Sequence, residues 1–412
     1  MLAALRRRDF ALLWLGGLVS SIGDLILYVA LPFYVYILSG SALATGTMFL
    51  AETLPRLLLG SLAGVFVDRW DRRRTMLVAD LARVALVLLL LLLHSRGTLW
   101  VVYVVAALES AVGQFFGPAQ NALLPRLVGD ELLVPANALN ALSMAVTQLV
   151  GPSLGGALFA LLGLRGVVLA DSFSFLFSAA MLALIVVPSA APTVVEVAAD
   201  GMALVAGIAR GWLEGLRLVR RERTLTALFV ALGLGAVGQG IINVIVVIFV
   251  RQVLHGSALT FGWLITAQGV GGILGGLLVG QVSRRLSPAT LLLIGGLAAG
   301  GTLVVIALFP SVLLTLVLIA PAGVTIVGYS VSASTLLQRG TADAFRGRVF
   351  GALGTTNALM MLAGIGAASV LGDRLGAAVL LAVAGLLYAA AGLAALALPV
   401  YSGASAVELP AP

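Results

Sequence analysis

Long apolar stretches, separated by short polar segments, make up most of the chain. Twelve such stretches contain roughly 20 residues or more, and they run at 10–38, 43–67, 75–93, 98–122, 137–163, 166–187, 224–250, 259–283, 289–309, 312–336, 349–371 and 376–398. At a rise of about 1.5 Å per residue, about 20 apolar residues cross the hydrocarbon core of a bilayer. The pattern therefore predicts an all-α integral membrane protein with twelve transmembrane helices.

The polar segments between these stretches predict the orientation. All 24 basic residues are Arg, and most of them fall on one side of the membrane if the spans alternate. The other side receives only Arg96, Arg165, Arg251 and Arg374. Because basic residues accumulate in cytoplasmic loops, we expect both termini in the cytoplasm and the protein in the inner or plasma membrane.

One longer polar segment, 188–223, divides the chain into two sets of six spans. Its first part is rich in Ala, Pro and Val, and its second part carries several Arg residues in the pattern of an amphipathic helix lying on the membrane surface. We therefore predict a six-helix bundle at 1–187, a cytoplasmic linker at 188–223, a second six-helix bundle at 224–398 and a cytoplasmic tail at 399–412.

A weak internal repeat supports this division. Four residues at the inner end of the fourth predicted span recur 213 positions later, namely Leu123, Leu124, Arg126 and Asp130 as Leu336, Leu337, Arg339 and Asp343. Gly60 and Gly64 recur as Gly276 and Gly280. Parallel repeats of this kind are found in membrane transporters.

Composition narrows the chemistry. Hydrophobic residues make up 61% of the chain and charged residues 10%, with no Cys and two His. The lack of Lys and Cys excludes a phosphate-binding loop, a Schiff base and thiolate chemistry, so we predict no enzyme activity, no cofactor and no metal site. The net charge of +7 is explained by membrane orientation, and we expect no nucleic acid partner.

The loop after the second span reads Gly64-Val-Phe-Val-Asp68-Arg69-Trp70-Asp71-Arg72-Arg73-Arg74. It resembles the signature cytoplasmic loop of the major facilitator superfamily, and Asp71 in place of the usual Gly resembles the drug-exporter branch with macrolide and siderophore exporters. The resemblance extends over the chain and implies alternating access between two six-helix bundles.

We expect this loop to act as a cytoplasmic gate made of Gly64, Asp68, Arg69, Arg72, Arg346 and Arg348. Asp68 could pair with Arg69 or Arg72, or with the positive end of the eleventh span behind Arg346 and Arg348. Alternatively, these Arg residues only set the membrane orientation.

The fifth span contains Gly151, Pro152, Gly155 and Gly156. This segment resembles the antiporter motif of proton-coupled drug exporters, in which Gly and Pro bend a helix and permit close packing. Thr147 and Gln148 are candidates for the polar residue that usually precedes the motif. The alternative is a packing face of small residues without a further role.

Seven ionisable residues lie inside predicted spans, all in the first half: Asp24, Glu52, Arg56, Asp80, Arg83, Glu109 and Asp171. Each one costs about 2.5–3.5 kcal/mol on insertion scales, so each needs a partner or a function. Glu52 and Arg56 are four residues apart and Asp80 and Arg83 three apart, so each pair can neutralise itself on one helix face.

Asp24 and Glu109 fall near mid-membrane without a basic residue within one turn of their own helix. An unpaired carboxyl group in a low-dielectric medium favours its protonated form, which suits a proton carrier. Our proton-coupling candidates are therefore Asp24 and Glu109, followed by Glu52 and Asp171; for Asp171 a place at the membrane boundary is expected. The alternative is that Arg56 or Arg83 neutralises Asp24 and Glu109 across helices.

Aromatic and amide side chains in the spans are candidates for a substrate cavity: Tyr28, Phe115, Gln239, Asn243 and Asn357. We predict a monomeric secondary transporter that exports an amphipathic, drug-like compound in exchange for protons, with the lipid bilayer and the small molecule as its partners. A siderophore exporter or a lysophospholipid flippase of the same fold is the alternative. A lipid-modifying enzyme and a membrane sensor are the candidates from other classes.

Overall fold

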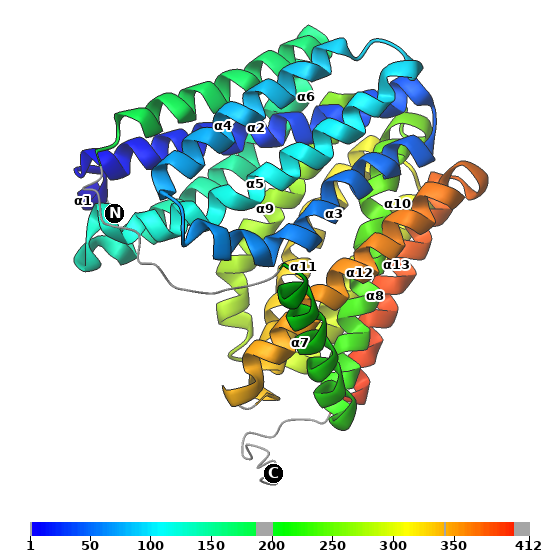
Figure 1. Cartoon of the computed structure of the whole chain (residues 1–412). Helices are drawn as coiled ribbons and strands as arrows, with labels where there is room; N and C mark the ends of the chain where they lie inside the picture. Colours follow the sequence, from blue (N-terminus) through cyan, green and yellow to red (C-terminus); the bar gives the residue numbers. More distant parts are fainter. Residues whose placement is uncertain (1, 187–200, 342, 399–412) are drawn as a thin grey trace. The chain divides into compact units, whose positions relative to one another are not determined.

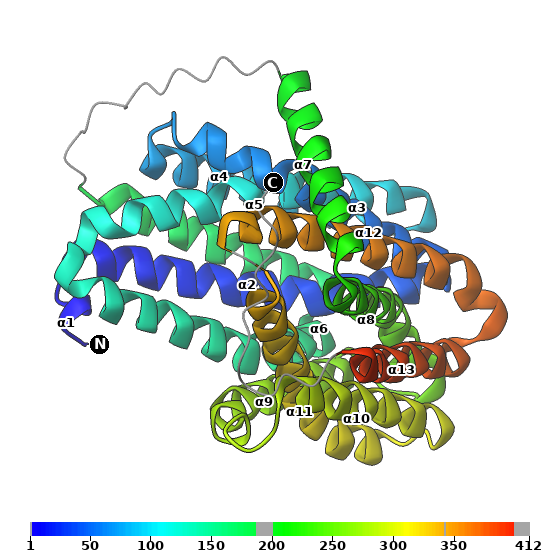
Figure 2. The same ribbon diagram turned by 90° about the horizontal axis from the view of Figure 1, so that it is seen from below.

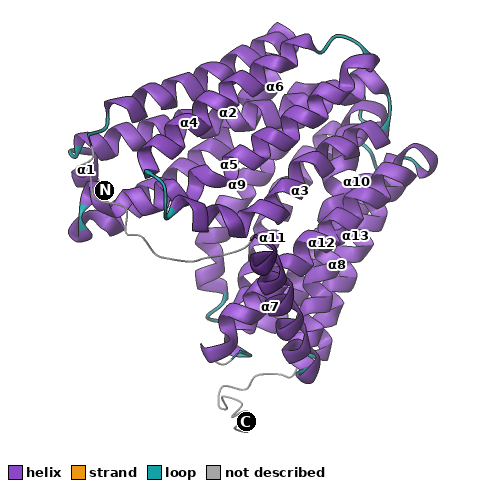
Figure 3. Cartoon of the chain, in the orientation of Figure 1, coloured by secondary structure: helices purple, strands orange, loops and turns teal. Residues whose placement is uncertain are grey.

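The computed structural model describes residues 2–186, 201–341 and 343–398, and the described chain is helical throughout, with short connections between helices (Figure 3). It divides into two compact units. The first unit is Met1–Glu196 together with Val250–Thr266, and the second is Val197–Phe249 together with Ala267–Pro412.

Six α-helices of the first unit follow one another along the chain (Figure 1). They are α1 (Leu2–Leu5), α2 (Arg8–Ser39), α3 (Ala42–Val67), α4 (Arg72–Leu88), α5 (Leu99–Val128) and α6 (Leu133–Leu184). Short 3-10 turns lie between them at Leu89–Leu92, Arg96–Thr98 and Asp130–Leu132.

The second unit contains the helices after residue 200, except where α9 passes from one unit to the other. They are α7 (Gly201–Arg221), α8 (Arg223–Ile248), α9 (Ala258–Val282), α10 (Pro288–Leu308), α11 (Val312–Arg339), α12 (Asp343–Leu375) and α13 (Ala377–Leu393). A π-helical turn at Phe249–Val253 follows α8, and a 3-10 turn at Ala394–Ala397 follows α13.

The described residues of every predicted apolar stretch are helical except at some of the stretch ends, which confirms an all-α membrane fold and is consistent with twelve spans. Within the described residues, ten helical segments are long and apolar enough to cross a membrane. One of them contains two predicted spans, because α6 continues through a kink at Gly163, where φ is 64° and ψ is −165°. α3 is not among these ten segments, but it covers the predicted span at 43–67 and has 26 residues.

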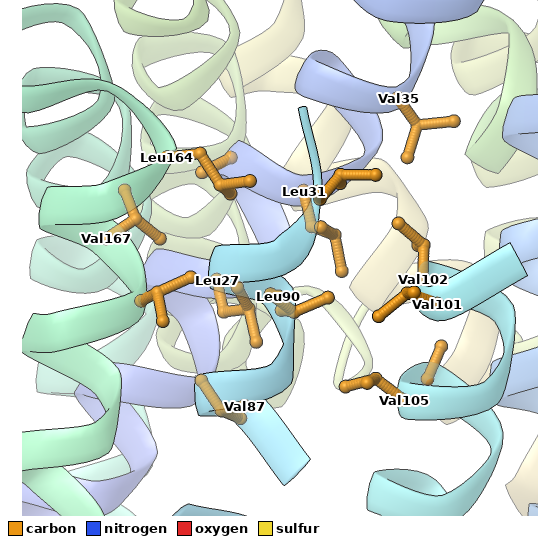
Figure 4. Close-up of a cluster of buried hydrophobic side chains, with 14 of the residues drawn as sticks. Leu27, Leu31, Val35, Val87, Leu90, Val101, Val102, Val105, Leu164 and Val167 are labelled. Carbon is orange, nitrogen blue, oxygen red and sulfur yellow. The ribbon is translucent and has the colours of Figure 1, made fainter. Parts of the chain in front are cut away.

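Mostly aliphatic side chains from α2, α3, α4, α5 and α6 form a hydrophobic core cluster of the first unit (Figure 4). Its members include Leu27 and Leu31 of α2, Val87 of α4, Val105 of α5 and Val167 of α6. Close packing of these side chains holds the helices that carry the charged residues discussed below.

Close approach of α6 to α2 depends on glycine. A Cβ at Gly155 would lie 2.8 Å from the backbone oxygen of Ile26 and 2.9 Å from its Cα, and a Cβ at Gly156 would lie 2.5 Å from the backbone oxygen of Ala258. Gly155 and Gly156 therefore face backbone, which cannot move as a side chain can. Of the two polar candidates upstream of this motif, Thr147 is buried and Gln148 is exposed.

The amphipathic helix α7 packs against α12, and its position on the membrane surface remains a prediction. Figure 2 shows α7 crossing α12. At the crossing, a Cβ on Gly215 would lie 2.6 Å from Ala352 Cβ, and Trp212 Nε1 donates a hydrogen bond of 3.2 Å to Thr356 Oγ1. One face of α7 thus docks on a helix, while Arg210, Arg217, Arg220 and Arg221 remain exposed. The first part of the predicted linker and the tail at 399–412 lie outside the described residues.

The packing at Gly155 predicts the effect of one added methyl group. We expect Gly155→Ala to destabilise the protein by about 1–3 kcal/mol, because the methyl group overlaps the Ile26 backbone. The measurement is thermal unfolding of the purified protein in detergent.

Gly301→Ala in α10 is the matched control, because a Cβ at Gly301 meets nothing within 4 Å. Its stability should be unchanged or raised by up to about 1 kcal/mol through helix propensity. Equal unfolding temperatures of the two variants would contradict the tight contact between α2 and α6.

Candidate functional site

A cavity of about 180 Å³ lies within the first unit, between α2, α3, α4 and α5. Its wall combines apolar and charged side chains: Asp24, Leu25, Leu27, Tyr28, Leu31, Met48, Glu52, Arg56, Arg83, Val105, Ala106 and Glu109. Tyr28 packs edge-on against Phe49 with ring centroids 6.3 Å apart. The cavity therefore offers an apolar surface with charged groups at defined points.

Arg83 of α4 is the centre of the charged wall. Its Nη2 donates to Asp24 Oδ1 of α2 at 2.8 Å, and its Nε donates to Glu109 Oε1 of α5 at 2.9 Å. The guanidinium carbon also lies 4.1 Å from the centre of the Phe175 ring of α6. One side chain, 9% exposed, thus connects four helices of the unit.

These contacts correct two expectations. Asp24 and Glu109 are not unpaired, because Arg83 neutralises both across helices, as the alternative interpretation held. The predicted pair of Asp80 with Arg83 is wrong for this structure. Arg83 points to the other two carboxylates, and neither carboxylate oxygen of Asp80 makes a hydrogen bond.

Asp171 of α6 lies inside the unit, against α2, and its expected place at the membrane boundary remains a prediction. Its side chain is fully buried, and its Oδ1 accepts a hydrogen bond of 3.3 Å from Ser174 Oγ. A Cβ on Gly23 of α2 would lie 2.6 Å from the same Oδ1. The glycine beside Asp24 is therefore what allows α2 to approach Asp171.

The predicted pair of Glu52 and Arg56 is confirmed. Arg56 Nη2 contacts Glu52 Oε1 on the same face of α3, and the Arg56 side chain is 59% exposed. The Glu52 backbone oxygen accepts a hydrogen bond of 2.7 Å from Ser110 Oγ of α5. This hydrogen bond joins α3, at the residue that pairs with Arg56, to α5, the helix that also carries Glu109.

Phe115 lies elsewhere than predicted. It stacks on Trp70 with ring centroids 5.7 Å apart and also contacts Phe66, and it does not line the cavity described here. The Phe115 ring of α5 therefore packs on the loop after α3, and its contact with a substrate remains a prediction.

In the loop after α3, Asp71 has a local structural role. Its Oδ1 accepts a hydrogen bond of 2.7 Å from Arg74 N, so Asp71 is the N-cap of α4, a position that Asp favours. Arg73 donates from Nε to the Leu182 backbone oxygen at 2.7 Å and also contacts the Ala183 oxygen, so it caps the end of α6. Asp68 is the C-cap residue of α3.

Arg346 and Arg348 both have acidic partners inside the second unit. Arg346 pairs with Asp343, and Arg348 Nη1 lies 3.9 Å from Glu214 Oε2 of α7. A contact from Asp68 to the start of α12 would join the two units, and it remains a prediction.

Polar side chains of the second unit form a separate chain of hydrogen bonds. Tyr388 OH donates to Gln239 Oε1 at 3.0 Å, and Gln239 Nε2 donates to Asn243 Oδ1 at 2.9 Å. Asn357 Oδ1 is buried without a hydrogen-bond partner in the described chain. Three of the predicted cavity residues thus lie in this unit, two of them bonded to each other.

Comparison with known proteins now identifies the family. A family model described as Major Facilitator Superfamily matches residues 13–365 and, in a second match, residues 228–410. The chain belongs to the major facilitator superfamily. It is accordingly a multi-pass membrane transporter of small molecules and not an enzyme.

Similar proteins within the superfamily are named as efflux proteins. Macrolide efflux protein A of Streptococcus pyogenes is 26% identical over 371 residues, covering 89% of this chain and 90% of that protein. The multidrug efflux pump Tap of Mycobacterium bovis is 30% identical over 411 residues, covering 96% and 91%.

A solved structure shows the same fold. The bacterial homologue of the iron transporter ferroportin, in an inward-facing state, has a TM-score of 0.76 and 19% identity, covering 94% of this chain and 98% of that chain.

Within the described residues of the present chain, no group of three His, Asp or Glu side chains is arranged to hold a metal ion.

Two contributors to the site escaped prediction from sequence. Phe175 lies under Arg83, and Tyr388 bonds Gln239. No spacing rule connects residues on helices that are distant in sequence, so only the folded bundle brings these pairs together.

Because Arg83 is buried and Arg56 is exposed, we expect loss of Arg83 to lower the free energy of unfolding more than loss of Arg56. Arg83→Met leaves Asp24 and Glu109 without their cation, and removal of one partner of a buried ion pair costs about 3–5 kcal/mol. Arg56→Met removes an exposed partner and should cost about 1 kcal/mol or less. Thermal unfolding in detergent compares the two, and a similar loss in both variants would contradict the arrangement described here.

Proposed function

We propose that this transporter exports an amphipathic organic compound by alternating access, in exchange for protons bound at the cluster of Asp24, Arg83 and Glu109. The observation that supports the proposal is Arg83, which holds carboxylates of two other helices together on the wall of a partly apolar cavity.

The geometry suggests how protons and substrate are coupled. Asp24 is 40% exposed and Glu109 21% exposed, so both carboxylates are accessible from the cavity side while Arg83 is covered. A proton on either carboxylate removes its charge and weakens its bond to Arg83. Since the partners lie on α2, α4 and α5, proton binding loosens the contacts that fix these three helices.

The cavity lining favours a substrate with a large apolar part. Tyr28, Leu31 and Met48 provide aromatic, aliphatic and thioether surface beside the charged groups. The relatives named for macrolide and multidrug efflux agree with an organic compound of this kind. A siderophore or a lysophospholipid is the second candidate for the same fold.

Orientation and assembly complete the proposal. The positions of the Arg residues support cytoplasmic termini in the cell membrane and a cytoplasmic gate at Gly64, Asp68, Arg69 and Arg72. We further propose two functional bundles at 1–187 and 224–398, joined by the segment 188–223, in a transporter that works as a monomer.

Neutral substitutions test the proton coupling. In proteoliposomes with an imposed pH gradient, Asp24→Asn and Glu109→Gln should each reduce gradient-driven erythromycin transport at least about tenfold, because the exchangeable carboxyl group is absent. Exchange of labelled for unlabelled erythromycin without a gradient should continue. Glu131→Gln, at an exposed position in the turn before α6, is the control and should transport as the wild type does. Gradient-driven transport at the wild-type rate in both test variants would rule out these carboxyl groups as proton carriers.

The substrate class is tested by competition. Macrolides and lipophilic cations should inhibit erythromycin transport by the purified, reconstituted protein, whereas a catecholate siderophore and lysophosphatidylglycerol should not, because the cavity combines apolar surface with excess carboxylate. Transport of only the siderophore or only the lysolipid would replace the leading proposal by the alternative.

A further inference from the structure

Asp80 is a buried carboxyl group that the proposed function leaves without a role. Its side chain has no exposed surface, and neither Oδ1 nor Oδ2 makes a hydrogen bond. Buried polar groups in folded proteins almost always have a hydrogen-bond partner, so this exception requires an explanation. The requirement is stronger inside a membrane, where an unpartnered carboxyl group cannot turn to water.

The position of Asp80 relative to Arg83 offers an explanation for this unpartnered carboxyl group. Both residues lie on the buried face of α4, together with Met76, Ala79 and Val84. Side chains three residues apart share a helix face, and helical side chains lean toward the N-terminus of their helix. The long Arg83 side chain can therefore reach the turn that carries Asp80, although in this structure it extends to Asp24 and Glu109 instead.

Charges on the neighbouring helices show why a second partner matters. In the described part of the first unit, Arg83 is surrounded by Asp24 from α2, Glu109 from α5, Asp171 from α6 and Asp80 from its own helix. Glu52 and Arg56 of α3 also face the cavity, but they pair with each other. One guanidinium thus serves a group of four carboxyl groups.

Asp80 is better placed than Asp171 to receive the guanidinium. Asp171 already accepts a hydrogen bond from Ser174 and is packed against Gly23. Neither oxygen of Asp80 has a hydrogen bond of normal geometry, and its nearest polar neighbour besides Arg83 is the Ser178 hydroxyl; in Asp171 only Oδ2 lacks a partner. Once it is ionised, Asp80 offers two acceptor oxygens on the same helix face as Arg83, and a guanidinium with five donors can satisfy both.

We propose that Asp80 is the second partner of Arg83, and that the guanidinium moves from Asp24 and Glu109 to Asp80 when these two carboxyl groups lose their charge during transport. The inference rests on the proposed function for the event that removes the charge. Two protons are needed to neutralise both Asp24 and Glu109. Asp80 supplies one of them and is left ionised beside the arriving guanidinium, and the second is taken up through the cavity. The exchange therefore binds one proton in total, and the cation follows the negative charge.

In this role Asp80 is a positioning residue. It keeps a buried cation paired while the carboxyl groups at the cavity carry protons. Without it, the protonated state would contain an unpaired guanidinium in the membrane, which is strongly unfavourable.

Thermal unfolding of the full chain in detergent tests the exchange without any substrate. Asp24→Asn with Glu109→Gln imitates the two protonated carboxyl groups. Asp80→Asn alone should change the unfolding temperature little, because no hydrogen bond is lost. Added to the double variant, it should lower the temperature by about 5 °C or more beyond the sum of the separate effects, because Arg83 then lacks its new partner.

Asp171→Asn on the same double variant is the matched control, because Asp171 is equally buried and lies in the same group of charges. Its effect should be additive. Additive effects of Asp80→Asn, or a larger loss with Asp171→Asn, would overturn the assignment of Asp80.

Transport separates this inference from the proposed function. Asp80→Asn should slow erythromycin transport driven by a pH gradient at least about tenfold while exchange without a gradient continues, and Asp80→Glu should restore part of the rate. Gradient-driven transport at the wild-type rate in Asp80→Asn would overturn the inference. If the wild type itself shows no gradient-driven transport, proton antiport fails as the proposed function, and the unfolding experiment alone decides the role of Asp80.

Discussion

A charged group inside hydrocarbon must be neutralised or kept in contact with water, and this requirement shapes the first unit of the transporter. Arg83 meets it by bonding Asp24 and Glu109 from two other helices and by lying on the Phe175 ring of a third. The cluster that includes Leu27, Val87 and Val105 packs the helices that carry this group against one another. The ion pairs are therefore a joint between helices and at the same time part of the wall of the cavity.

Glycine residues allow the helices of the first unit to approach one another closely. Gly155 lies against the backbone of Ile26, and Gly23 lies against Asp171 and Ser174. Because lipid provides no hydrophobic force between helices, dispersion contacts at short distance have to hold the bundle together, and small residues permit them. Gly23, the residue before Asp24, thus lets α2 pack directly against the buried carboxyl group of Asp171 on α6.

Connections between the helices show how local chemistry supports the site. Asp71 begins α4 as an N-cap, and Arg73 in the same loop bonds the last carbonyl groups of α6. These contacts fix the start of the helix that carries Asp80 and Arg83. The departure of Asp71 from the general superfamily pattern is accounted for by helix capping, with no need for a role in transport.

How much of this was predictable depends on the range of the interaction. Apolar length determined the spans, the charged loop and the glycine motif indicated the superfamily, and a spacing of four residues was enough to predict the pair of Glu52 and Arg56, since both side chains stand on one helix face. The same rule failed for Asp80 and Arg83. A spacing rule describes only which partners a helix offers, whereas Arg83 found two carboxylates on other helices, 59 and 26 residues away in sequence.

Membrane character, helix positions and the set of buried charges are thus properties of the sequence alone, because they depend on the composition of each segment. The choice of partners for those charges, the place of Phe115 beside Trp70 and the burial of Asp171 were decided by tertiary structure. They depend on which helix faces meet, and helix packing brings together residues that no local pattern connects.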